Sequence, residues 1–140
     1  MSLILQTPRL LVREFSLADA PALQLICGNR RTMRHVGDGT TLDLARCTEW
    51  IRVSLRDYAG KGHGAWAVFV AGAEPMAGYA GIVSAARRAD PEIIYALQPQ
   101  WWQQGLAGEL IPALLDHGFS RCHLPRLVAT IAAGNTASCR

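Results

Sequence analysis

The sequence predicts a mixed α/β fold, with a central sheet flanked by helices. Three strand-length apolar runs with turn-rich segments between them indicate an antiparallel meander: Ala65–Val70, Met76–Val83 and Ile93–Leu97. An apolar stripe at helical spacing then runs from Leu106 to Phe119, and 127–132 is typical of one more strand. A strand, a helix and a strand in this order favour a parallel pair with a right-handed crossover, so the sheet should be mixed.

The part of the chain before the meander predicts one strand and two helices. The run Leu10–Phe15 is typical of a strand, and Ser16 can cap the helix after it, with Asp19 placed to complete a near capping box. A Gly- and Arg-rich segment covers 28–41, and a second helix should end near Gly60. The expected inward positions are Leu17, Leu23 and Ile26 in the first helix, and Leu44, Cys47, Ile51, Leu55 and Tyr58 in the second.

Length and composition predict one globular domain over residues 1–140. Half of the residues are hydrophobic and 18% are charged, which suits a folded core better than a disordered chain. No run approaches the roughly 18 apolar residues of a membrane span, and the N-terminus lacks the pattern of a signal peptide. We therefore expect a cytoplasmic protein that does not bind membranes.

Cysteine spacing and charge exclude two further classes of function. The cysteines lack the spacing of a zinc site, so we expect reduced thiols and no metal. The net charge is +3, and the arginines occur in small groups, not in the continuous basic stripe that is typical of a nucleic-acid binder. These arginines are either solvated loop residues or attract an anionic ligand. The residues concerned are Cys27, Cys47, Cys122 and Cys139, and Arg30, Arg31, Arg34, Arg87 and Arg88.

The strongest chemical signal lies in the turn between the third meander strand and the long helix. This polar turn, from Pro99 to Glu109, contains Gly105 and Gly108. At a helix N-terminus such a turn can point successive backbone N–H groups outward, where they and the helix dipole attract phosphate. Taken alone, it is more often an ordinary bend, because glycine is common wherever a chain turns sharply.

Four short motifs resemble those of one enzyme family, and they occur in the family's order. Thr7-Pro8-Arg9-Leu10-x-Val12-Arg13 is similar to its opening Thr-x-Arg-Leu-x-Leu-Arg, and Glu92-Ile93-Ile94-Tyr95-x-Leu97-x-Pro99 to its Glu-Ile-Gly-Tyr strand. Trp102-Gln103-Gln104-Gly105-Leu106-Ala107-x-Glu109 resembles its Trp-Gly-Lys-Gly-Tyr-Ala-x-Glu pyrophosphate loop, and Asn135-Thr136-Ala137-Ser138 its Asn-x-Ala-Ser element. The family is the GNAT superfamily of N-acetyltransferases, in the branch of the ribosomal-protein N-terminal (Rim-type) acetyltransferases.

The resemblance implies acetyl transfer from acetyl-CoA to a primary amine, on a protein N-terminus or a small molecule. A backbone N–H near Leu97 would stabilise the oxyanion. Asn135 would face the pantetheine arm, while its alternative role is the N-cap of the last helix. The expected cofactor-binding residues are Leu97, Gln103, Gln104, Gly105, Leu106, Ala107, Gly108 and Asn135.

Glu92 is the candidate general base, because it opens the strand at the position of the family's glutamate. An α-amino group titrates near 8, so a positioned carboxylate needs only to take its proton directly or through water. The alternative is a strand-edge carboxylate paired with Arg87 or Arg88. Competing interpretations of the whole chain are a coenzyme-A-binding module without catalysis and an inactive fragment that oligomerises.

Several positions depart from the family pattern. Ile94 and Gln103 replace glycines, and Pro112 should cost the long helix one hydrogen bond and kink it. The family continues for two more strands, so the resemblance implies a C-terminally incomplete fold. The exposed edge at 127–132 then favours either a homodimer or a loosened C-terminal third with little turnover. Trp101 and Trp102 either line the cofactor site or pack in the core, which is the commoner fate of such rings. His63, His117 and His123 are expected at helix ends or on the surface.

Overall fold

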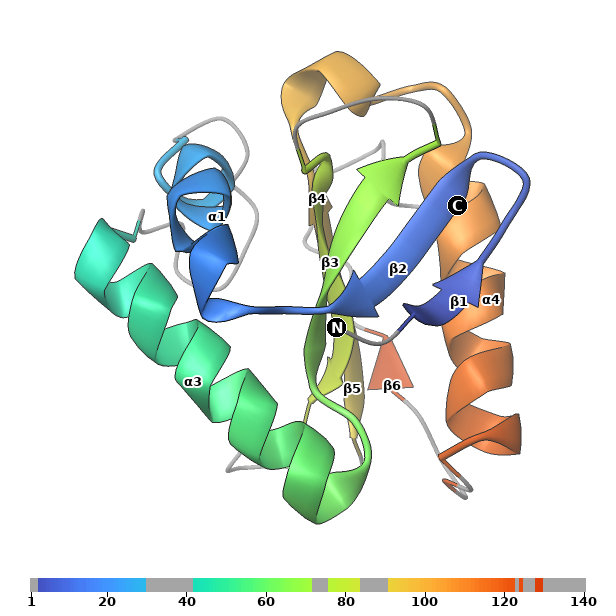
Figure 1. The fold of residues 1–140 in the computed structure, drawn as a ribbon. Helices are drawn as coiled ribbons and strands as arrows, with labels where there is room; N and C mark the ends of the chain where they lie inside the picture. Colours follow the sequence, from blue (N-terminus) through green and yellow to red (C-terminus); the bar gives the residue numbers. More distant parts are fainter. Residues whose placement is uncertain are drawn as a thin grey trace.

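The computed structural model describes residues 3–29, 42–71, 76–83, 91–122, 124 and 128–129. Within these residues the strands form a single sheet whose order follows the chain (Figure 1). Neighbours from β1 to β5 are antiparallel and β5 pairs with β6 in parallel, which confirms the mixed sheet. The strands are β1 (Leu3–Gln6), β2 (Leu10–Glu14), β3 (Ala65–Val70), β4 (Gly78–Val83), β5 (Glu92–Leu97) and β6 (Val128–Ala129).

Helices cover both faces of the sheet. On one face lie α1 (Ala20–Cys27), which follows the short 3-10 helix η1 (Leu17–Asp19), and α3 (Leu44–Lys61); α4 (Leu106–Ser120) covers the other face (Figure 1). Alternate residues of each strand therefore enter two separate cores. In β5, for example, Ala96 joins the core beneath α1 and α3, whereas Ile93 and Leu97 join the core beneath α4.

The structure differs from the sequence prediction at three inward positions and in one strand. Three expected inward residues at or near helix ends are about half exposed: Leu17 at 49%, Leu44 at 46% and Phe119 at 48%. Each lies in η1 or in a terminal helical turn, where regular helical spacing no longer aims a residue at the sheet. The second helix ends at Lys61, close to the expected Gly60, and Gly62 caps it with a left-handed φ of 79°. Strand β1 was not predicted.

The helix α4 continues without a break through its proline. Pro112 lies inside Leu106–Ser120, one turn after Gly108. Because proline has no N–H, the carbonyl of Gly108 lacks its usual helical donor. The helix is not divided there, and the buried positions Leu106, Leu110 and Leu114 keep one continuous face against the sheet.

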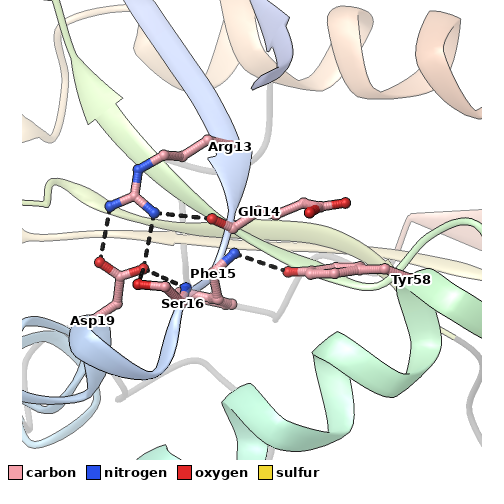
Figure 2. A network of polar contacts seen from close by, with 6 residues as sticks. All are labelled: Arg13, Glu14, Phe15, Ser16, Asp19 and Tyr58. Carbon is pink, nitrogen blue, oxygen red and sulfur yellow. Dashed lines mark hydrogen bonds and ion pairs between the residues drawn. The ribbon is translucent and has the colours of Figure 1, made fainter. Parts of the chain in front are cut away.

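A polar network fastens the end of β2 to η1 and α3 (Figure 2). Arg13 donates two hydrogen bonds to the Asp19 carboxylate, at 2.9 and 2.8 Å, and the N–H of Ser16 donates a third at 2.7 Å. The N–H of Phe15 donates to the Tyr58 hydroxyl, which donates in turn to the carbonyl of Ala65. The near capping box expected at Ser16 and Asp19 is thus present, with the N–H of Ser16 donating to the Asp19 side chain.

We expect Asp19→Asn to lower the free energy of unfolding by about 2 kcal/mol at neutral pH, the usual scale for hydrogen bonds to a charged group. Burial opposes ionisation of Asp19, but the hydrogen bonds from Arg13 and Ser16 outweigh it and lower the pKa of the carboxyl. Its contribution is therefore complete above the unfolded pKa of about 4 and is lost as pH falls through the folded value. Urea unfolding from pH 7 to pH 3 should show the two proteins converging in acid, and a constant difference would contradict this explanation.

Candidate functional site

The turn after β5 is held against the sheet by two tryptophans and a glutamine. The indole N–H of Trp102 donates to the carbonyl of Leu97 at 2.7 Å, and the Gln98 side chain donates to the carbonyl of Met76 at 3.0 Å. Trp101, in the 3-10 helix η2 (Pro99–Trp101), and Trp102 pack partly buried on the α4-side core. The expected packing role of both rings is confirmed, and it fixes where the turn enters α4.

Two residues of this turn have left-handed backbones. Gly105 caps α4 with φ of 77°, and Gln103 has φ of 59°. Glutamine thus keeps a left-handed conformation where the family pattern has glycine, which costs roughly 1–2 kcal/mol for a residue with a Cβ. Gln103, Gln104, Gly105 and Gly108 are exposed, whereas Leu106 is buried and anchors the helix.

The first turn of α4 has backbone donors without helical acceptors. The first hydrogen bond of the helix runs from the N–H of Glu109 to the carbonyl of Gly105, at 3.2 Å. The N–H groups of Leu106, Ala107 and Gly108 precede that bond, so the helix itself provides them with no partner. Donors in this arrangement, at the positive end of the helix dipole, suit the phosphates of a coenzyme.

Residues from the start of the chain contact the same turn. Glu109 accepts from the backbone N–H and the Nε of Arg9, each at 2.9 Å, and also from the Thr7 hydroxyl. The Nη1 of Arg9 donates to the carbonyl of Gln104 at 2.7 Å. The hydrogen bond from Thr7 is the largest of the effects that lower the pKa of Glu109, followed by that from the Arg9 N–H. Glu109 is therefore an ionised carboxylate whose two oxygens both accept hydrogen bonds. The sequence motif contained Glu109 but did not reveal these partners.

Glu92 lies at the other end of β5 from Leu97. It is partly buried, and its backbone pairs with Val83 of β4 and Val128 of β6. At about 3.3 Å per residue, five residues of strand separate Glu92 from Leu97 by roughly 16 Å. Strand alternation places Glu92 on the same face as Ile94 and Ala96, which is the face toward α1 and α3.

Several sequence predictions fall outside the described residues. Asn135 and Ser138 do so, as do the arginines considered as ligands or as partners of Glu92, namely Arg30, Arg31, Arg34, Arg87 and Arg88. The predicted edge at 127–132 is described only at β6, so self-association through it stays a prediction. The structure thus brings together the expected residues from Leu97 to Gly108, sets Glu92 apart from them, and does not test Asn135.

The cysteines Cys27 and Cys47 and the histidine His63 are buried in the protein interior. Cys27 of α1 and Cys47 of α3 are buried side by side, and burial, followed by the influence of Cys47, raises the pKa of the Cys27 thiol. His63 follows the end of α3, as expected, but is buried, with its Nδ1 2.8 Å from the carbonyl of Ile82. His123 lies outside the described residues.

The described part of the chain contains no cluster of three or more His, Cys, Asp or Glu residues that could hold a metal ion. Nor does it contain a helix long and apolar enough to cross a membrane.

Comparison with known proteins decides the family. Residues 9–140 match the model of the acetyltransferase (GNAT) domain. The chain belongs to the GNAT acetyltransferase family. It is therefore an acetyltransferase that depends on acetyl-CoA, and the mixed α/β sheet described above is the GNAT fold.

The relatives agree with this assignment. The chain is 29% identical over 140 residues to an uncharacterized N-acetyltransferase, YoaA, of Bacillus subtilis, covering 98% of this chain and 78% of YoaA. An acetyltransferase structure from Agrobacterium tumefaciens has a TM-score of 0.80 at 27% identity, covering 99% and 78% of the two chains. A RimL ribosomal-protein acetyltransferase in complex with coenzyme A has a TM-score of 0.79 at 18% identity, covering 98% and 78%, which is a likeness of fold.

Proposed function

We propose that this GNAT chain folds as one domain and transfers the acetyl group of acetyl-CoA to a primary amine, with the coenzyme phosphates bound by the turn before α4. The observation that carries the proposal is the set of helix N–H groups at Leu106, Ala107 and Gly108, presented by two left-handed residues. A coenzyme bound there extends its pantetheine arm from the end of β5, so the N–H near Leu97 is the proposed donor to the oxyanion.

Glu92 is proposed as the base that receives the proton of the attacking amine. The strand length puts Glu92 about 16 Å from Leu97, too far for one carboxylate to touch an amine held at that end. A proton leaving an amine at that end would have to pass along several ordered water molecules to reach Glu92. The effect of removing the carboxylate should depend on pH, because an amine that is already neutral does not need a base before it attacks.

We expect Gly105→Val to weaken coenzyme A binding about tenfold or more, because a β-branched residue at φ of 77° costs roughly 1–2 kcal/mol. The change forces the turn to rearrange and adds bulk where phosphate approaches. The nearest heavy atom to a Cβ at Gly105 is the Arg9 Nη2 at 3.4 Å, an ordinary contact, so backbone strain is the main cause. Isothermal titration with coenzyme A measures the change in dissociation constant.

Gly62→Val is the matched control for this experiment. Gly62 has nearly the same left-handed φ, 79°, and nothing lies within 4 Å of its added Cβ. It ends α3, so the variant should lose comparable stability while it retains the affinity for coenzyme A. Equal affinity in the Gly105 and Gly62 variants would refute the proposed phosphate site.

We propose that the acceptor is a primary amine, either a protein N-terminus, as in the Rim-type branch, or a small-molecule amine. The four motifs of that branch support this choice, and the RimL likeness is consistent with it as a likeness of fold. Thiol release from acetyl-CoA, measured with N-terminal peptides and with small polyamines, distinguishes the two acceptor classes. No turnover with any peptide would remove the Rim-type assignment and leave the small amines.

A further inference from the structure

The Thr-Pro-Arg segment at residues 7–9 contacts the turn before α4 from the far end of the sequence. Arg9 and Glu109 are separated by 100 positions, yet their side chains form an ion pair at 2.9 Å. The proposed reaction assigns no role to this segment. Its position beside the turn indicates one.

The backbone of this segment is fixed by the sheet. The N–H of Thr7 donates to the carbonyl of Leu10 at 2.8 Å, and the carbonyl of Arg9 accepts from the N–H of Ala71 at 2.8 Å. The N–H of Leu10 also donates to the Thr7 hydroxyl at 3.0 Å. Arg9 therefore extends from a rigid support at the start of β2, so its guanidinium can impose a position on the turn.

The guanidinium contacts the turn on both sides of Gly105. Nη1 holds the carbonyl of Gln104, immediately before the left-handed glycine, and Nε holds Glu109, one turn into α4. A planar guanidinium can make both contacts at once, whereas a lysine ammonium is a single point charge on a flexible stem. The two contacts set the direction of the peptide groups between them.

Charge alone does not explain the arrangement. Residues 103–108 contain no Lys or Arg, and Gln104 stands where the family pattern has lysine. The charge of Arg9 is offset by Glu109, so phosphate binding depends on the backbone N–H groups and hence on the shape of the turn. A residue that maintains that shape controls affinity without contacting the acetyl group.

We propose that Arg9 is a positioning residue for coenzyme A, which holds the turn at 103–108 in its phosphate-binding shape through Gln104 and Glu109. The inference rests on the proposed phosphate site. Arg9→Gln removes the ion pair and the bridge, and we expect about a tenfold weaker dissociation constant for coenzyme A. Arg9→Lys keeps the charge but loses the bridge, so it should recover only a small part of the affinity.

Arg56→Gln is the matched control, because it removes the same charge from a side chain that is 73% exposed on α3. Its dissociation constant for coenzyme A, measured by the same titration, should equal that of the parent. Unchanged affinity in Arg9→Gln overturns the proposal. Full recovery in Arg9→Lys also overturns it, because charge would then suffice.

Hydrogen exchange of the ligand-free proteins separates positioning from a general loss of stability. In Arg9→Gln the amide of Glu109, which donates to the carbonyl of Gly105 and closes the first turn of α4, should exchange faster, while those of β2 and β3 keep the parent rates. Faster exchange throughout the sheet would overturn the proposal. The Gly105→Val titration keeps the two ideas distinct: if that variant binds normally, the phosphate site is wrong, and if only Arg9→Gln binds normally, the role of Arg9 is wrong.

Discussion

Replacing Glu92 by glutamine should lower turnover at neutral pH roughly a hundredfold, the lower range of what general base catalysis contributes. The reason is the lost proton acceptor, since glutamine has the same shape without the charge. The loss should shrink above about pH 8, where an α-amino acceptor is already neutral. The affinity for coenzyme A should stay unchanged, because Glu92 and the phosphate-binding turn lie at opposite ends of β5.

Thiol release followed from pH 6 to pH 10 measures this effect. Glu14→Gln is the matched control, because Glu14 is also a partly buried strand carboxylate and lies in β2, away from the proposed site. A loss of turnover that is the same at every pH, or no loss, would contradict the role of Glu92 as base and favour the alternative of a structural carboxylate at the strand edge. A lower melting temperature with normal turnover would support that alternative directly.

Gly78→Ala should destabilise the protein by about 3 kcal/mol or more, at the upper end of the cost of overpacking. A Cβ at Gly78 would stand 2.0 Å from the carbonyl oxygen of Ala96 and 3.0 Å from the Cα of Leu97. These are backbone atoms of β5, so no side chain can move aside and β4 must separate from β5. Urea denaturation measures the loss, and because Leu97 leads into the turn, coenzyme A affinity should fall as well.

The same substitution at Gly60 should have the opposite sign. Gly60 lies inside α3, and nothing is within 4 Å of its added Cβ. Alanine is favoured over glycine in a helix by about 0.5–1 kcal/mol, so Gly60→Ala should raise the unfolding free energy. If Gly78→Ala were as stable as the parent, the close approach of β4 and β5 would not constrain the sheet.

Much of the fold follows from periodicity. The bounds of β3 were predicted, and β4 and β5 within two residues, because these strands carry unbroken apolar runs between turn residues. β1 was missed because its four residues are partly or fully exposed and have no core pattern. Leu17 and Phe119 were placed inward because spacing alone does not reveal where the sheet stops covering a helix.

In the candidate site, too, the features formed by neighbouring residues could be predicted, and the contacts between distant residues could not. The phosphate-binding turn could be predicted, because its glycines and the helix after it are adjacent in sequence. The contacts of Arg9 with Gln104 and Glu109 could not, because no local pattern joins residues about 100 positions apart. The buried pair Cys27 and Cys47 was missed for a similar reason, since the two cysteines meet only through the packing of α1 on α3.

The strand order has a consequence for how the molecule assembles. Although β2 pairs with β3 across a long segment, β3, β4 and β5 follow one another over short connections, and such local pairing favours rapid folding. The ion pair of Arg9 with Glu109 is different, because closing it joins distant segments after α4 has formed. We therefore expect β3, β4 and β5 to acquire their protection early in refolding and coenzyme A affinity to emerge last, when the first and the final thirds of the chain meet.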